Sequence, residues 1–470
     1  MISRRSFLAR MGTGAAACAS IGSYTAHAQA KPPNIVLIMA DDLGYGHLGC
    51  YGQQHIRTPN IDRLAREGTR FTQAYAGCSQ CAPSRSVLMT GYHSGHTPVR
   101  GNSGGISLCE EDVTVAEVLQ RAGYRTGLFG KWGLGDADTP GVPNKQGFDE
   151  FFGYLHQKHA HFYYTDYLWH NDARFALPGN MDGKREQYTP DVILDRALDF
   201  IRASKEAPFF CFVSSTIPHH EWAVPESSLK EYSGRFDETR PEFRWREGYA
   251  FPKEPKATMA AMISHLDKGV GKIIQLLDEL KLRENTLVLF TSDNGPDSYS
   301  MTNLDFFKAS GPLRGHKYDL YEGGIRVPAI ASWPGTMQAG VASDLPWHFA
   351  DIMPTFAELA ERSSEVPKNI DGISIAPSLR GEDKQATREF LYWDADSGSR
   401  AVRMGDWKLV QPKRDAEPEL YDLKSDIGES RNVAATHKDI VARMLDIANA
   451  SYTPPPLQTE PLAPDGRLYR

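Results

Sequence analysis

The sequence predicts an α/β protein with a large, mixed and mostly parallel sheet sandwiched by helices, plus a small C-terminal antiparallel sheet with one helix. Three observations predict it. Apolar runs rich in β-branched residues lack alternation, which is typical of strands buried on both faces of a parallel sheet. Segments with helical spacing separate these runs. From about residue 377, short strand-like segments follow one another.

The individual elements follow from these patterns. In the large sheet we expect strands at residues 34–40, 126–129, 208–213 and 286–291. Helical spacing covers residues 113–121 and 259–280. The small sheet is expected at residues 389–393, 399–404, 407–410 and 420–423, its helix at 437–449, and an irregular proline tail at 454–456. The chain therefore divides into an N-terminal segment 1–30, a main domain 31–376, and a small α+β subdomain with a tail, 377–470.

The first 30 residues have the layout of a cleaved export signal. Arg4 and Arg5 before Phe-Leu resemble the twin-arginine class, an apolar stretch follows at 12–21, and small residues allow cleavage after Ala28 or Ala30. We therefore expect a periplasmic or secreted protein that uses the twin-arginine export machinery.

The composition excludes some classes of function. The 470 residues carry a net charge of −7, and removal of the three arginines in the signal takes the charge to −10. A surface this acidic argues against nucleic acid as the main partner, although small anionic substrates respond to the local site. No later segment reaches the ~20 apolar residues that a membrane span needs.

Acidic residues follow two of the expected strands. Asp41 and Asp42 come after the first strand, and Asp293 and Asn294 come after the strand at 286–291. Ligands of open α/β sheets bind beyond the carboxyl ends of the strands, so these side chains should meet at one edge. Oxygen ligands without thiolates favour calcium or magnesium. The alternative is that these acids cap the helices that follow.

The segment at 44–49 matches G-x-G-x-x-G, which is typical of dinucleotide sites. Asp41 and Asp42 immediately before it would repel a pyrophosphate, and no clear helix begins at the third glycine. We therefore do not expect a nucleotide site.

Six cysteines raise the question of pairing. Cys18 leaves with the signal; the alternative, that it carries a lipid, lacks the bulky residue expected before a lipidated cysteine. The remaining five are Cys50, Cys78, Cys81, Cys109 and Cys211.

Cys78 and Cys81 form a C-x-x-C without a second pair, which is weak evidence for structural zinc. Pro83 places Cys81 at the start of a helix that continues to Thr90. Arg85, one turn on, then points back toward residue 81 or an anion held there.

These residues carry a resemblance to a known family. The segment CAPSR at 81–85, followed by LMTG at 88–91, resembles the signature of the type I sulfatases, the formylglycine-dependent, arylsulfatase-like members of the alkaline phosphatase superfamily. Further segments resemble the family in the same order: ADDLGYG at 40–46, TPNID at 58–62, GKW at 130–132, QGFD at 146–149, PH at 218–219, SDNG at 292–295, LRGHK at 313–317 and YEGGIRVP at 321–328. DWKL at 406–409 and LYDL at 420–423 resemble its C-terminal subdomain.

The resemblance implies a sulfuric ester hydrolase whose catalytic domain is 31–376. A maturation enzyme would convert Cys81 to formylglycine. One hydroxyl of the hydrated aldehyde would attack sulfur, and the other would later collapse and expel sulfate. One calcium ion would act as Lewis acid and template. Its implied ligands are Asp41, Asp42, Asp293, Asn294 and residue 81.

The resemblance also implies the remaining catalytic roles. Arg85, Lys131 and Lys317 would share the negative charge of the transferring group. His219 or Lys317 would protonate the leaving oxygen. Without the resemblance, each of these side chains would be interpreted as a solvated surface group or as packing.

Two positions depart from the family pattern. Gly133 stands where the family usually has a histidine that contacts the formylglycine hydroxyl, and Gln80 replaces an aliphatic residue. Our hypothesis is that another histidine substitutes for the missing one. The candidates are His96, His156, His159 and His161.

The stretch 154–170 is dense in aromatic residues and histidines, which favours a sulfated sugar as substrate because rings stack on sugar faces. Packing of a long loop is the alternative. Two other functions stay open: a phosphomonoester or phosphonate hydrolase of the same superfamily, and a catalytically silent calcium-dependent glycan-binding protein.

Because twin-arginine export moves folded protein, we expect Cys81 to be modified before export. Cys78 is then left as a disulfide partner or a buried thiol.

Overall fold

The computed structural model describes residues 32–102, 106–238, 249, 252–298, 304–382 and 384–455. The export signal with its cleavage sites, and the tail from residue 456, lie outside the described residues. Among the described helices, none is both long and apolar enough to cross a membrane.

The large sheet has ten strands and is parallel at its centre. In spatial order the strands are β11 (Val341–Ser343), β2 (Thr69–Phe71), β10 (Ala329–Ser332), β9 (Thr286–Ser292), β1 (Asn34–Asp41), β8 (Phe209–Pro218), β4 (Arg125–Lys131), β5 (Glu150–Tyr154), β6 (Tyr167–His170) and β7 (Ala173–Ala176). The five strands from β9 to β5 run parallel, whereas β10, β6 and β7 pair antiparallel with their neighbours. The expected mixed, mostly parallel sheet is confirmed.

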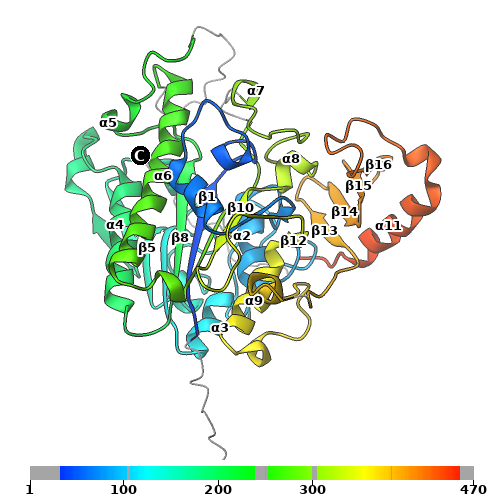
Figure 1. Ribbon diagram of the computed structural model, residues 1–470, viewed down its shortest axis with the longest axis horizontal. Helices are drawn as coiled ribbons and strands as arrows, with labels where there is room; N and C mark the ends of the chain where they lie inside the picture. Colours follow the sequence, from blue (N-terminus) through cyan, green and yellow to red (C-terminus); the bar gives the residue numbers. More distant parts are fainter. Residues whose placement is uncertain are drawn as a thin grey trace, which may run out of the picture. The chain divides into compact units, whose positions relative to one another are not determined.

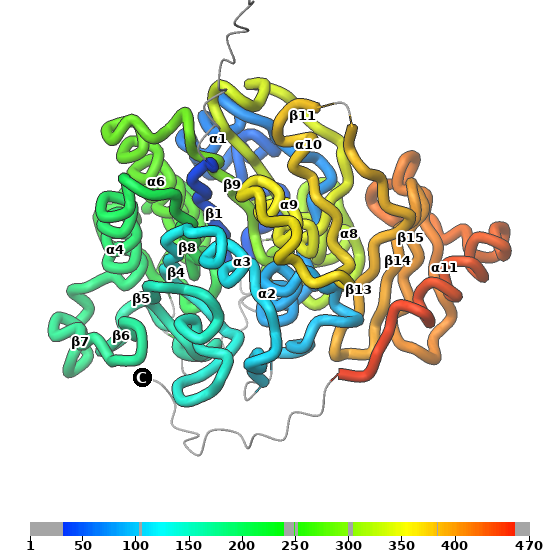
Figure 2. Tube along the Cα trace, turned by 90° about the horizontal axis from the view of Figure 1, so that it is seen from below, coloured from blue at the N-terminus to red at the C-terminus, as the bar shows by residue number. Residues whose placement is uncertain are grey.

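Helices cover both faces of this sheet. Every residue of the central strand β1 is therefore buried. Val36 and Ile38 belong to one core cluster, and Ile35 and Leu37 belong to another, as the alternation of side chains along a strand requires. The first cluster packs against α1 (Pro59–Arg66), α4 (Thr189–Ser204) and α6 (Pro255–Glu279). The second packs against α2 (Cys81–Thr90), α3 (Val115–Arg121) and α9 (Ile352–Leu359). Figure 2 shows the strands between these two helix layers.

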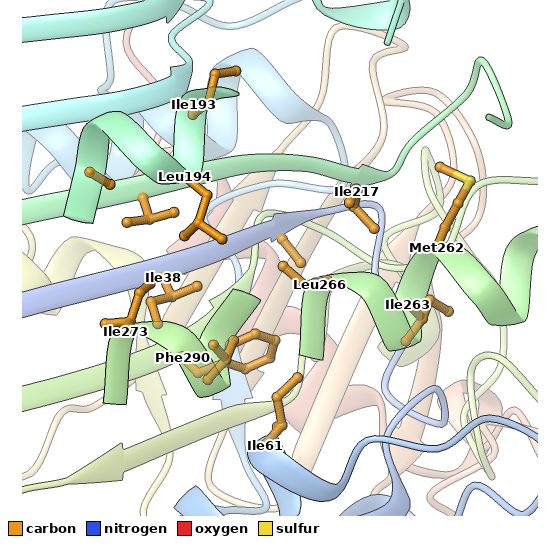
Figure 3. Packing of buried hydrophobic residues seen from close by; sticks show 14 of the residues in the cluster. Ile38, Ile61, Ile193, Leu194, Ile217, Met262, Ile263, Leu266, Ile273 and Phe290 are labelled. Atoms are coloured by element: carbon orange, nitrogen blue, oxygen red, sulfur yellow. The ribbon is translucent and has the colours of Figure 1, made fainter. Parts of the chain in front are cut away.

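A close view of the first cluster shows how tightly the sheet and its helices are joined. Ile38 of β1 and Phe290 of β9 face Leu266 and Ile273 of α6, and Leu194 of α4 belongs to the same cluster (Figure 3). This packing holds the carboxyl ends of β1 and β9 in a fixed relation.

The C-terminal sheet is separate and antiparallel (Figure 1, orange). Its strands are β13 (Leu391–Asp394), β14 (Arg400–Met404), β15 (Trp407–Gln411) and β16 (Glu419–Asp422), and α11 (Lys438–Ala450) follows them. Val402 and Leu409 pack on one face against Met444 of α11. On the other face, Ala401 and Val410 join a cluster with Ile325 and Tyr75 from the earlier part of the chain.

The remaining strands and α-helices are short. They are β3 (Ala74–Tyr75), which pairs with β12 (Trp347–His348), and the helices α5 (Glu226–Leu229), α7 (Leu304–Phe307), α8 (Glu322–Ile325) and α10 (Ala376–Leu379). All eight strands expected from the sequence are confirmed with shifted ends. The sequence patterns did not indicate the short strands β2, β10 and β11, the β5–β7 meander or helix α4.

Candidate active site

The carboxyl ends of β1 and β9 bring the two acidic pairs together. Ala40 pairs with Ser292 in the parallel register, so the residues that follow lie side by side. Asp42 adopts a left-handed conformation (φ 65°), and its N–H donates to Asp293 Oδ1 at 3.1 Å. The next N–H, of Leu43, donates to Ser292 Oγ at 2.9 Å. Two hydrogen bonds therefore hold the chain that leaves β1 against the end of β9.

Cys81 lies at this edge as the first residue of α2. Its Sγ is 3.4 Å from Asp41 Oδ1 and 3.9 Å from Asp42 Oδ1. Ser84 Oγ donates to the carbonyl oxygen of Asp293 at 2.5 Å, which fixes the first turn of the helix against β9. Burial, together with Asp41, raises the pKa of the Cys81 thiol well above its usual value. As a cysteine, this residue is therefore a poor nucleophile.

Three buried cations surround the same carboxylates. Arg85 donates to Asp293 Oδ2 at 2.8 Å and to the carbonyl oxygen of Lys131 at 2.8 Å. Lys131 Nζ lies 2.7 Å from Asp41 Oδ2, and Lys317 Nζ lies 2.8 Å from Asp42 Oδ2. Burial alone would lower the pKa of Lys317, but Asp42 holds that pKa well above its usual value. The lysines and the arginine are therefore not solvated surface groups.

His219, just after β8, completes the cluster. Its Nδ1 lies 2.6 Å from the carbonyl oxygen of His220, so Nδ1 carries the proton, and its Nε2 lies 3.5 Å from Asp42 Oδ2. Tyr163 OH donates to the carbonyl oxygens of Thr216 and His219, at 2.6 and 2.8 Å, and so holds this loop. Burial, reinforced by His220 and Lys317, lowers the pKa of His219 well below its usual value.

The oxygen donors fit a hard divalent cation. Ligand atoms of Asp41, Asp42, Cys81 and His219 lie within 4.8 Å of one another. Burial raises the pKa of Asp42 to about 8; Lys317 opposes this rise, whereas the neighbouring carboxylates of Asp41 and Asp293 add to it. The buried Asn294 Oδ1 accepts no hydrogen bond from any described residue. Crowded carboxylates and an amide oxygen without a donor are what a calcium or magnesium ion requires.

The structure brings all nine predicted site residues to this one edge. Sequence reasoning missed the residues that support them. Ser214 of β8 bonds Arg85 Nη1 at 2.5 Å, and Tyr163 holds the His219 loop. No local pattern in the sequence marks either residue.

In the aromatic stretch, Tyr154 and Tyr163 are buried, whereas Phe162, Tyr164 and Tyr167 are only partly buried. Part of this aromatic stretch is therefore buried, which agrees with the alternative interpretation that these residues pack a long loop.

The structure separates the four candidate histidines. The His161 ring lies 4.5 Å from that of His219, with its Nδ1 2.6 Å from Tyr249 OH. In contrast, His96 pairs with Asp371 at 2.9 Å, and His159 packs against Tyr154 with ring centroids 5.0 Å apart. His156 Nε2 lies 3.9 Å from Asp136 Oδ2. His161 is the candidate beside the site, and its role stays a prediction.

Gly133 and Cys78 also have clear surroundings. Gly133 has φ +80°, and a Cβ there would lie 2.3 Å from Gln157 Nε2, so the Gln157 amide takes the space of a side chain at 133. Cys78 is a buried free thiol with Sγ 3.5 Å from the carbonyl oxygen of Asp394, and burial raises its pKa to about 12. Of the two interpretations left open for Cys78, the structure favours the buried thiol.

Comparison with known proteins agrees with this geometry. A family model described as Sulfatase matches residues 33–362. The chain belongs to the sulfatase family. A second model, described as the C-terminal region of N-sulphoglucosamine sulphohydrolase, matches residues 316–449 of this sulfatase.

Curated relatives support the assignment over most of the chain. The sulfatase is 34% identical to human (Homo sapiens) arylsulfatase A, covering 86% of this chain and 84% of that protein. It is 29% identical to an N-acetylgalactosamine-6-O-sulfatase of Bacteroides thetaiotaomicron, covering 90% and 94%. The solved structure of Ps i-CgsB in complex with k-i-k-neocarrahexaose matches with a TM-score of 0.77 at 28% identity, covering 90% and 93%. The protein is therefore a sulfuric ester hydrolase.

Proposed function

We propose that this sulfatase hydrolyses sulfate esters on a carbohydrate, with formylglycine derived from Cys81 as nucleophile and one calcium ion as bound metal. The observation that carries the proposal is the convergence of three buried cations and His219 on the carboxylates beside Cys81. A carbohydrate substrate is supported by similarity to the N-acetylgalactosamine-6-O-sulfatase and to the structure with neocarrahexaose.

The charge balance of the site suits a sulfate ester. Its three carboxylates and three cations balance each other when all are charged. A bound divalent cation would leave this buried group of side chains positive by two charges. Arg85, Lys131 and Lys317 would then bind the sulfate oxygens and stabilise the charge that develops on them.

The pKa of Cys81 supports its conversion. A thiol held neutral beside Asp41 is unsuited to attack, whereas a hydrated aldehyde at the same position supplies a hydroxyl nucleophile and a second hydroxyl that releases sulfate. Calcium, held by Asp41, Asp42, Asp293, Asn294 and residue 81, would supply Lewis-acid polarisation and orientation. Residue 81 lies at the N-terminus of α2, where the helix dipole favours negative charge.

His219 or Lys317 would protonate the leaving oxygen. Both side chains lie against Asp42, on the side of the site bounded by the loops after β8 and before α8. A poor leaving group such as a sugar alkoxide needs this proton far more than p-nitrophenolate does. Replacing the acid should therefore slow sugar sulfates much more than p-nitrophenyl sulfate, which can be tested with His219→Asn and Lys317→Met.

The direct test of the nucleophile is mass spectrometry of the tryptic peptide 71–85, using protein from the native host. We expect the mass of formylglycine at residue 81; an alkylatable thiol there would overturn the proposal. Sulfate release from a panel of sulfated mono- and oligosaccharides then tests the substrate class. Faster hydrolysis of p-nitrophenyl phosphate than of the sulfate would favour the phosphoester alternative. Glycan binding without any release, after confirmed modification, would favour the silent glycan-binding protein.

We also propose that the protein is exported by the twin-arginine route after Cys81 has been modified. The motif at Arg4 and Arg5 supports this route. Replacing both arginines with lysine should retain the protein in the cytoplasm, and undisturbed export would contradict the proposal.

A further inference from the structure

A second buried charge cluster ties the small C-terminal sheet to the segment that carries Lys317. Lys408 of β15 is fully buried, and its Nζ lies 2.9 Å from Glu322 Oε1 and 3.1 Å from Glu429 Oε1. Glu322 is the first residue of α8, five residues after Lys317. Lys408, a cation of the C-terminal sheet, therefore binds α8, the helix that follows Lys317 of the candidate active site.

Glu322 is held from both sides. Its Oε2 accepts hydrogen bonds from Tyr75 OH of β3 at 2.7 Å and from Arg326, at the end of α8 itself, at 3.1 Å. Its backbone N–H donates to Glu429 Oε2 at 2.6 Å. Burial alone would raise the pKa of Glu322, but Lys408, Arg326 and Arg403 hold it at about 2. The position of α8 is therefore fixed by paired charges.

Helix α8 is in direct contact with the segment that carries Asn294. The N–H of Gly295, next to Asn294, donates to the carbonyl oxygen of Gly324 at 2.9 Å. A Cβ on Gly295 would lie only 1.9 Å from the carbonyl oxygen of Gly323. The N–H of Lys317 donates to the carbonyl oxygen of Pro296 at 2.9 Å. A shift of α8 would therefore move both Asn294 and Lys317.

We propose that Lys408 is a positioning residue for sulfate-ester hydrolysis: by binding Glu322 and Glu429 together, it fixes α8 and, through α8, Lys317 and Asn294. The inference rests on the proposed roles of Lys317 and Asn294. Burying three charges costs desolvation that well-packed apolar side chains would avoid, so such a cluster is poorly explained by stability alone. It does define one register between the two sheets, which apolar contacts would define less sharply.

The test compares Lys408→Met with a matched control, Arg400→Met. Arg400 is a buried cation of the adjacent strand β14, but its partners Gln411 Oε1 and Asn449 Oδ1, at 2.6 and 2.7 Å, lie within the C-terminal sheet and α11. Both variants loosen the C-terminal part, and only Lys408→Met releases α8. Both are measured well below their unfolding temperatures.

Two readouts are needed. Lys408→Met should lower kcat roughly 10- to 100-fold, because misplacement by about 1 Å has effects of this size, and should change KM much less. Hydrogen exchange of amides 316–325 should also become faster in Lys408→Met. Arg400→Met should retain wild-type kcat and wild-type exchange in that segment. Equal kcat and equal exchange in the two variants would overturn the proposal.

The exchange readout needs no substrate, so it separates a failure of this inference from a failure of the proposed function. A second pair of variants covers the case in which Lys408→Met does not fold. Glu322→Gln breaks the ion pair that holds α8, whereas Asp394→Asn removes a buried carboxylate whose side-chain partners, Tyr392 and Arg414, lie within the C-terminal part. We expect lower kcat and faster exchange of 316–325 in Glu322→Gln only. Indistinguishable behaviour of these two variants would refute the role of Lys408.

Discussion

Two buried carboxylates, one in each charge cluster, show opposite responses to the same burial. Asp42, in the candidate active site, has its pKa raised to about 8. Glu322, between the two sheets, has its pKa lowered to about 2. Neither residue has more than 2% of its surface exposed. Burial disfavours the charged form of both, so the difference comes from their neighbours.

The balance of neighbouring charges differs. Asp42 has a cationic partner, Lys317, against the carboxylates of Asp41, Asp297 and Asp293, whereas the cations Lys408, Arg326 and Arg403 surround Glu322. A cluster whose carboxylates are paired with cations of the protein needs no further cation, and it can join two parts of the fold. A cluster with crowded carboxylates gains stability when a further cation binds. Buried charge alone therefore does not identify an active site, whereas crowded like charge beside an amide oxygen without a donor points to one.

The largest effect should come from Cys81→Ala. If residue 81 supplies the nucleophile, as proposed, its removal should lower the turnover of a sulfated sugar by at least roughly 10³-fold. The alanine fits the buried position, so the melting temperature should stay close to that of the wild type. Sulfate release and a thermal melt on the same preparation test both statements. Residual turnover above a tenth of the wild type would show that residue 81 is not the nucleophile.

Glu322→Gln should destabilise the protein by roughly 3 to 5 kcal/mol, the usual cost of removing one partner of a buried ion pair. Lys408 and Glu429 remain, but Arg326 and Arg403 lose their shared anion. Urea unfolding at neutral pH measures the change in the free energy of unfolding. A loss below about 1 kcal/mol would mean that the two clusters differ less than their pKa values indicate.

Asp42→Asn should destabilise the metal-free protein less than Glu322→Gln does. The variant loses the ion pair with Lys317 but also relieves the repulsion from Asp41 and Asp293, so the free energy of unfolding in EDTA should fall by less than about 3 kcal/mol. The wild type should gain stability when calcium is added, whereas Asp42→Asn should gain little, because binding to the folded state alone stabilises by mass action. Thermal melts in EDTA and in calcium separate these effects. A loss in EDTA as large as that of Glu322→Gln would contradict the comparison.

The sequence predicts the centre of the fold better than its edges. The runs that form β1 and β9 are continuous and apolar because both faces are buried, and so the position of their carboxyl ends could be predicted. The strands β2, β10 and β11 have only three or four residues each, too few for a periodic pattern. The β5–β7 meander is rich in aromatic residues, which fit a loop as well as a strand.

The candidate site divides in the same way. Asp41, Asp42 and Asp293 follow buried strands, so their meeting could be derived from the sheet, whereas the roles of Lys131 and Lys317 came from the resemblance. The supporting contacts depend on long-range pairing that no local pattern encodes. Glu322 and Glu429, for example, meet across 107 residues.

The smallest effect concerns the pH dependence of Glu429. Burial raises its pKa from 4.5 to about 7, with Glu322 adding to the rise and Lys408 opposing it. The folded protein therefore binds this proton more tightly than the unfolded chain does. The contribution of Glu429 to stability is greatest below pH 4.5 and is lost as the pH rises to about 7. Glu429→Gln resembles the protonated form and should remove this loss, which we expect to be roughly 1 to 2 kcal/mol. Urea unfolding of the variant and the wild type at pH 5 and pH 8 measures it. A variant that is equally less stable at both pH values would show that Glu429 is charged throughout and belongs with Glu322 among the carboxylates that cations hold ionised.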